Sequence, residues 1–153
     1  MSKTELVNPE RSREVSRVLE TPAADPRTAR SHHLNRLGLE TDPDDVHTDM
    51  QNGVRDFVVV DTRKRESYED SHVPGAISLH HRTINAETTR NLSKDKLLVV
   101  YCWGPGCNAS TKAAVKLSEL GFRVKEMIGG IEYWWKDGFP LEGAKAREFS
   151  NKQ

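Results

Sequence analysis

The sequence has little of three things that would indicate particular classes of protein: cysteine, net charge and long apolar runs. Its 153 residues include only two cysteines, fewer than a secreted domain of this size held by disulfides usually has. Basic and acidic residues number 23 each, so the basic excess typical of nucleic-acid binders is missing. No run approaches the ~20 apolar residues of a membrane helix, and the polar start of the chain lacks the apolar stretch of a secretory signal. We therefore expect a cytoplasmic protein with free thiols that binds neither nucleic acid nor membrane.

The length and the uneven distribution of apolar residues predict one domain with an extension at each end. A typical domain has roughly 100–150 residues, and the chain has 153. We place the domain at residues 41–145, after an N-terminal extension of residues 1–40 and before a C-terminal tail of residues 146–153. Apolar side chains at residues 15–19 fall on one helical face, so the extension is interpreted as either partly helical or mobile.

Short apolar runs alternate with helical patterns through the domain. The segments expected to be strands are "DFVVVD" (56–61), "GAISL" (75–79), "KLLVVYC" (96–102) and "RVKEM" (123–127). The segments expected to be helices are residues 43–51, 64–72, 83–92, 109–122 and 131–139. Continuous apolar strands are typical of parallel sheets covered on both faces, and strands that alternate with helices pair through right-handed crossovers. The pattern therefore predicts an α/β fold with a doubly wound, mainly parallel sheet and helices on both faces.

Cys102 ends one of these strands, and such sheets bind ligands beyond the carboxyl ends of their strands. The loop that follows consists of Trp103, Gly104, Pro105, Gly106, Cys107, Asn108 and Ala109. Glycines in a tight loop and the start of a helix direct backbone N–H groups toward an anion. No Asp or Glu occurs in residues 97–118, whereas Lys112 and Lys116 do, so we predict a lowered pKa for Cys102 and a nucleophilic thiolate. The alternative is a buried cysteine that acts as a small hydrophobic residue.

Three segments in this order resemble the rhodanese-like domain of single-domain sulfurtransferases. They are "DFVVVDTRKRESYEDSHVPGAISL", then "LLVVYC" with its loop, and "STKAAVKLSELGFRVKEMIGGIEYWWKDGFPLEG". The first segment matches the family signature at Asp61, Arg63, Tyr68, His72, Pro74, Gly75 and Ala76. The resemblance covers about residues 44–143 and implies a five-stranded sheet.

The resemblance also implies an activity. A small sulfur donor, thiosulfate or a persulfide, would give its outer sulfur to Cys102, and the resulting persulfide would rest in the loop. Cyanide, a thiol or an acceptor protein would then remove that sulfur, without a metal or an organic cofactor. The sequence leaves open whether the protein is a monomer or a homodimer.

The loop departs from the family pattern because it lacks the usual basic residue after the cysteine. We therefore propose Arg82, just after the strand at 75–79, as an anion contact, with a solvated surface residue as the alternative. Asp61 and Arg63 are interpreted as a structural hydrogen-bonded pair beneath the loop. Cys107 is either a resolving thiol that closes a disulfide with Cys102 or a passive residue.

Two other functions compete with sulfur transfer. A non-enzymatic binding or redox-sensing module would use Cys102 and Cys107 as a reversible thiol pair. A phosphatase or arsenate-reductase-like enzyme ranks lower, because the arginine that binds phosphate oxygens would stand six positions after Cys102, where this chain has Asn108.

Overall fold

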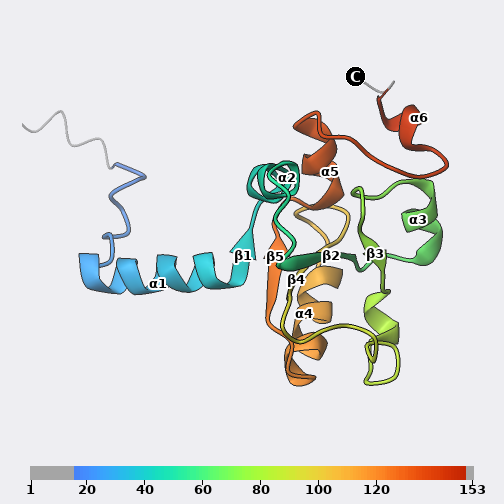
Figure 1. Cartoon of the computed structure of the whole chain (residues 1–153). Coiled ribbons are helices and arrows are strands. Elements are labelled where there is room, and N and C mark those ends of the chain that lie inside the picture. The colour runs from blue at the N-terminus through green and yellow to red at the C-terminus, as the bar shows by residue number, and fades with distance from the viewer. Residues whose placement is uncertain (1–15, 151–153) are drawn as a thin grey trace, which may run out of the picture. The chain divides into compact units, whose positions relative to one another are not determined.

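A computed structural model describes residues 16–150 of the chain (Figure 1). The chain divides into two compact units, residues 1–35 and residues 36–153. Residues 17–19 form a turn, so the helical alternative for residues 15–19 is absent from the described part of that segment. The domain boundaries drawn at residues 40 and 145 stay predictions.

Helix α1 (Pro26–Leu39) begins directly after Asp25, within the extension of residues 1–40 that the sequence interprets as partly helical or mobile. The Asp25 carboxylate accepts hydrogen bonds from the backbone N–H of Thr28 at 3.1 Å and from its hydroxyl at 2.6 Å. This is an N-cap, which satisfies N–H groups that the first turn of a helix leaves unpaired. The helix buries none of its side chains, so local capping rather than packing accounts for its start.

The sheet has five strands, and every pair is parallel, as predicted. The strands are β1 (Glu40–Thr41), β2 (Phe57–Asp61), β3 (Ile77–Ser78), β4 (Leu97–Tyr101) and β5 (Val124–Met127). Their order is β1-β5-β4-β2-β3, so β4 is central and its C-terminal end lies between those of β2 and β5. The register pairs Asp61 with Tyr101 and Val100 with Glu126, which brings these residues to the edge of the sheet where Cys102 follows β4.

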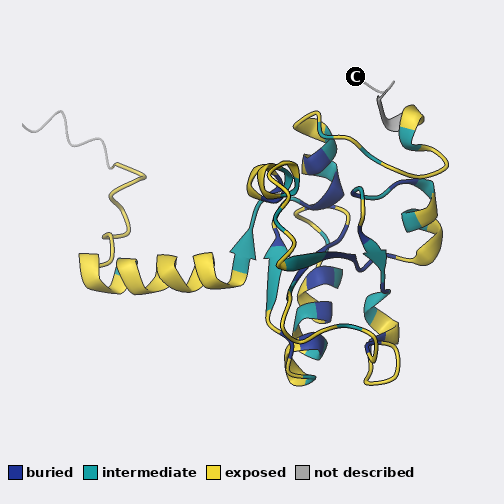
Figure 2. Cartoon of the chain, viewed as in Figure 1, coloured by how far each residue is buried: buried dark blue, intermediate teal, exposed yellow. Residues whose placement is uncertain are grey.

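Helices cover both faces of this sheet, as the sequence predicts. Figure 1 shows α2 (Pro43–Gln51) and α5 (Gly130–Lys136) on one side and α4 (Ala109–Glu119) on the other. Alternate residues of β4 point to opposite faces: Val99 and Tyr101 pack in the cluster that contains α2 and α5, and Leu98 and Val100 pack against α4. The buried residues in Figure 2 form a band along the sheet and the helix surfaces that face it.

The remaining helices are short, and one predicted helix is wrong. They are α3 (Arg65–Asp70), the 3-10 turn η2 (His81–Thr83) and α6 (Ala146–Ser150). Residues 86–91, within the helix expected at 83–92, form turns instead. There the Asn85 side chain accepts the N–H of Thr88, and the Thr88 hydroxyl accepts the N–H of Asn85. Asn and Thr side chains that bind nearby backbone in this way compete with helix formation.

Among residues 16–150, no helix is both long enough and apolar enough to cross a membrane.

Truncation of Leu117 should destabilise the domain. Leu117 on α4 is 0% exposed and packs beneath β4, so Leu117→Ala leaves a cavity and should lower the free energy of unfolding by about 2–5 kcal/mol. Val115 on the same helix is 56% exposed, and Val115→Ala should change it by less than ~0.5 kcal/mol. Urea unfolding followed by circular dichroism measures both. Equal losses in the two variants would contradict this placement of α4.

Candidate active site

The start of α5 fixes the first residues of the cysteine loop. The carbonyl oxygen of Cys102 accepts the N–H of Ile131 at 3.0 Å, and that of Trp103 accepts the N–H of Glu132 at 2.9 Å. Gly130 makes this contact possible. Its φ is +60°, and a Cβ built on it would lie 2.4 Å from the Cys102 oxygen and 2.8 Å from the Trp103 carbonyl. Any side chain at residue 130 would therefore push the loop away from α5.

The rest of the loop closes with a tight turn and then enters α4. The N–H of Cys107 donates to the carbonyl of Gly104 at 3.0 Å, and the N–H of Lys112 donates to that of Asn108 at 3.0 Å. Trp103, Pro105, Gly106 and Asn108 are exposed, Cys107 and Ala109 are half-buried, and Gly104 is buried. The loop predicted from the sequence thus connects the end of β4 to the start of α4.

Cys102 is 2% exposed, yet it lines a cavity of about 240 Å³ together with Cys107, Ser110 and Glu126. Its thiol donates to the Cys107 carbonyl at 3.2 Å and accepts the Ser110 hydroxyl at 3.6 Å. Both cysteines are thiols. The sulfur therefore lies on the wall of a cavity, as a nucleophile needs.

The sequence predicts a lowered pKa for Cys102, and this prediction is wrong. Burial raises the pKa of the Cys102 thiol, its hydrogen bond with Cys107 raises it further, and the N–H and hydroxyl of Ser110 only partly oppose them. Burial also raises the pKa of Cys107. Hydrogen bonds from Cys102 and from the N–H groups of Ala109 and Trp103 outweigh that effect, so the pKa of Cys107 falls below its ordinary value.

The loop amides therefore divide between two sulfurs instead of converging on Cys102. The N–H of Ser110 lowers the pKa of Cys102, and those of Ala109 and Trp103 lower the pKa of Cys107. When two thiols influence each other's ionisation, the loss of the first proton belongs to the pair.

A buried ion pair lies beneath the loop. The Asp61 carboxylate accepts Arg63 Nη2 at 2.7 Å and the Tyr101 hydroxyl at 2.7 Å, and Arg63 Nη2 also donates to the Ser71 carbonyl at 2.6 Å. Burial alone would lower the pKa of Arg63, but the hydrogen bonds and charge of Asp61 raise it above its ordinary value. The guanidinium carbon lies 6.0 Å from the centroid of the Trp103 ring, which connects the ion pair to the loop.

Basic side chains lie elsewhere than the sequence suggested. Arg82 is exposed on η2 and does not line the Cys102 cavity or the larger cavity next to it. Its contact with an anion therefore stays a prediction. Lys116 Nζ donates to the His81 carbonyl at 2.9 Å. Among the described residues, no group of His, Cys, Asp and Glu could hold a metal ion.

Glu126 and Ser110 are site residues that sequence reasoning missed. Glu126 Oε2 accepts the Thr111 hydroxyl at 3.1 Å and lies 3.1 Å from the Ser110 hydroxyl, whose single proton is donated either to this oxygen or to Cys102 Sγ. Both side chains line the Cys102 cavity. We expected no carboxylate near Cys102, because only residues 97–118 were considered for that prediction. The parallel strand "RVKEM" ends at the same edge of the sheet as Cys102, and this placement could have revealed Glu126.

The structure is an α/β domain in which a cysteine follows the central parallel strand. A tight loop connects this cysteine directly to the next helix. The family model of the rhodanese-like domain matches residues 42–137, and the chain belongs to this family.

Similar proteins agree with that assignment. The thiosulfate sulfurtransferase GlpE of Coxiella burnetii is 36% identical over 81 residues, which cover 52% of this chain and 73% of GlpE. The crystal structure of BH2092 from Bacillus halodurans is 47% identical with a TM-score of 0.80, over 81% of this chain and 90% of that one. The rhodanese-like domain of Alr3790 from Anabaena is 27% identical with a TM-score of 0.63, over 69% and 80% of the two chains.

Gly130→Ala should destabilise the loop anchor. Both Gly130 and Gly138 have positive φ, but a Cβ at Gly138 has nothing within 4 Å. Left-handed strain costs about 1–2 kcal/mol in either alanine variant, and the clash at residue 130 should add roughly 1–3 kcal/mol. Urea unfolding of the two variants measures the difference. Equal destabilisation would mean that close approach of α5 does not fix the loop.

The two thiols should titrate apart. Thiolate absorbance in the ultraviolet should show one ionisation below the ordinary thiol pKa and a second above it. Cys102→Ala removes a side chain that lowers the pKa of Cys107, so this pKa should rise. Cys107→Ala keeps the backbone carbonyl that accepts the Cys102 thiol but removes the side chain that raises the pKa of Cys102, so that pKa should fall. Two coincident ionisations that neither variant moves would contradict the paired arrangement.

Proposed function

We propose that this protein is a cytoplasmic sulfurtransferase that moves sulfane sulfur from a donor to a thiophilic acceptor through a persulfide on Cys102. The observation that carries the proposal is the position of the Cys102 sulfur. It follows the central strand, lines a cavity of about 240 Å³ and faces a second thiol and Ser110. The donor class is a persulfide or thiosulfate, the substrate in the name of the Coxiella relative.

Attack on the donor requires the Cys102 thiol to lose its proton, although burial and the neighbouring Cys107 raise its pKa. The N–H of Ser110 and its hydroxyl, 3.6 Å from Cys102 Sγ, lower this pKa and stabilise the thiolate that forms. The thiolate, not the thiol, attacks sulfur.

The transfer proceeds by two displacements on sulfur. The Cys102 thiolate attacks the outer sulfur of the donor, so a new S–S bond forms on Sγ. The donor S–S bond breaks at the same time, and its electron pair leaves with the donor thiolate or with sulfite. An acceptor thiolate then attacks the outer sulfur of the persulfide and releases the Cys102 thiolate. Electrons balance without a cofactor, and covalent catalysis of this kind divides one transfer into two easier steps.

The loop also suits the intermediate. A persulfide places negative charge one sulfur further out than the thiolate does. The N–H groups of Trp103 and Ala109, directed at Cys107 in the resting pair, lie on the same loop and can serve that outer sulfur. Anchoring of the loop carbonyls on α5 preorganises these donors, which is how backbone amides stabilise a developing anion.

One alternative has an observation in its favour. Cys102 and Cys107 line the same cavity, which supports a redox-sensing module in which an oxidant closes a reversible disulfide. A phosphatase has less support, since Asn108 occupies the position where the arginine would be and is exposed.

Cys102→Ser should abolish sulfur transfer. Removal of the nucleophile should lower the rate of thiocyanate formation from cyanide and a sulfur donor by on the order of 10³-fold or more. Intact-mass spectrometry of the donor-treated wild type should show one added sulfur on Cys102, and the variant should show none. Glu119→Gln, an exposed change at the far end of α4, is the control. Transfer that survives Cys102→Ser would remove the proposal, and a disulfide with negligible transfer would favour the redox module.

A further inference from the structure

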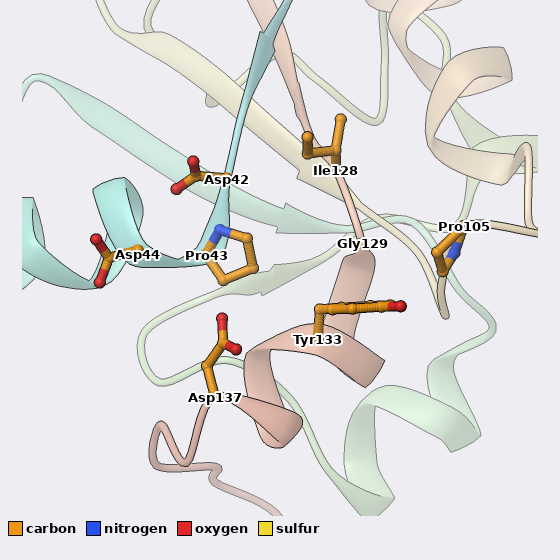
Figure 3. Close-up of a pocket in the computed structure, with 8 residues that line it drawn as sticks. All are labelled: Asp42, Pro43, Asp44, Pro105, Ile128, Gly129, Tyr133 and Asp137. Carbon is orange, nitrogen blue, oxygen red and sulfur yellow. The ribbon is translucent and has the colours of Figure 1, made fainter. Parts of the chain in front are cut away.

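A larger cavity adjoins the one that contains Cys102. It has a volume of about 480 Å³ and shares three of its lining residues, Pro105, Ile128 and Gly129, with the cysteine cavity. In Figure 3, Pro105 lies on one side of it and the start of α2 on the other, with Ile128 and the ring of Tyr133 between them. A molecule whose thiol reaches Cys102 can therefore place its neighbouring atoms in the larger cavity.

The walls of the larger cavity combine apolar surface with carboxylates. Pro43, Pro105, Ile128 and Tyr133 supply the apolar part, and Asp42, Asp44 and Asp137 supply the charge. The Asp42 carboxylate already caps α2 by accepting the N–H of Asp45 at 2.8 Å. Asp44 and Asp137 are exposed, and among the described residues neither forms an ion pair.

The charged side chains that line the two cavities are all acidic. Glu126 adds a carboxylate beside Cys102, and no Lys, Arg or His is among the described residues that line either cavity. Lys136 Nζ, which lies 4.9 Å from the centroid of the Tyr133 ring, is paired with Glu132. Like charges side by side disfavour an anionic ligand, whereas a cation would neutralise them. This field opposes a dianion such as thiosulfate at the entrance and favours a ligand with a positive charge next to its thiol.

The surface around the entrance is apolar beyond what a small thiol would cover. Ile128 and Tyr133, which line the larger cavity, are 44% and 43% exposed, although aromatic and aliphatic side chains of this size are usually buried. Exposed apolar residues grouped at a cavity mark a surface that binds another chain. Consecutive residues of an extended polypeptide are ~3.8 Å apart at Cα, so a cysteine in the small cavity would bring its neighbour to the larger one.

We infer that the larger cavity binds the residue next to the reacting cysteine of an acceptor protein, and that this residue is basic with apolar neighbours. The inference rests on the proposed function, because it assigns the acceptor class for the persulfide on Cys102. The aliphatic part of an Arg or Lys side chain would pack on Ile128 and Tyr133, while its charge would lie among Asp44 and Asp137. Side chains of this kind bury their carbon stems and keep the charged end near polar groups.

Matched peptides test the inference. Two peptides with one cysteine differ only in the next residue, Arg or Glu, and each is mixed with persulfide-loaded full-length protein. Mass spectrometry follows sulfur transfer to each peptide. The Arg peptide should react on the order of tenfold faster at low salt, and added salt should reduce the ratio. The double variant Asp44→Asn with Asp137→Asn should bring the ratio close to one, whereas Glu119→Gln should leave it unchanged.

A binding measurement separates this inference from the proposed function. Peptides with Ser in place of Cys cannot accept sulfur, and their dissociation constants are measured by NMR titration of the reduced protein. Tighter binding of the Arg peptide, with shifts at Ile128 and Tyr133, supports the subsite even if no persulfide forms on Cys102. Equal binding and equal rates for the two peptides would overturn it. So would a charge preference that survives the double variant, or a small aminothiol that accepts sulfur as fast as the Arg peptide.

Discussion

The structure of the site depends on one contact: the N–H groups at the start of α5 hold the carbonyls of Cys102 and Trp103. The contact requires glycine at residue 130, because a Cβ there would overlap the Cys102 oxygen. With those carbonyls bound to α5, the N–H groups of Trp103, Ala109 and Ser110 act on the two sulfurs. The same contact joins the loop to the strand β5 that precedes α5, so the cysteine cavity, Glu126 and the adjoining acidic cavity form one connected surface.

Chemistry at this surface depends on the surroundings of two thiols. Burial raises the pKa of Cys102, whereas hydrogen bonds outweigh burial at Cys107 and lower its pKa. Asp61 and Arg63 contribute from below, where their buried ion pair supports Trp103. Carboxylates then surround the entrance, in contrast to the cationic surroundings expected of a site for small oxyanions. We propose that a site with these acidic walls takes an acceptor that brings its own positive charge.

The sequence could predict the elements whose signal is local. The apolar runs of β2 and β4 and the periodic pattern of α4 predict a parallel sheet with Cys102 at its carboxyl edge, and the structure agrees. Strand β1 was not located, because its two residues, Glu40 and Thr41, carry no apolar signal and pair only through β5. The pKa order of the two cysteines depends on which N–H points to which sulfur, a property of the folded loop rather than of composition. Glu126 lies at the site because of the register between β4 and β5. This register is not visible when each segment of the sequence is considered separately.

A crystal structure of the donor-treated protein tests the central claim most directly. The account predicts an additional sulfur bonded to Cys102 Sγ, inside the cavity shared with Cys107, with a backbone N–H of the loop within hydrogen-bond distance of that sulfur. An additional sulfur on Cys107 instead, or one on Cys102 that no loop N–H approaches, would contradict it.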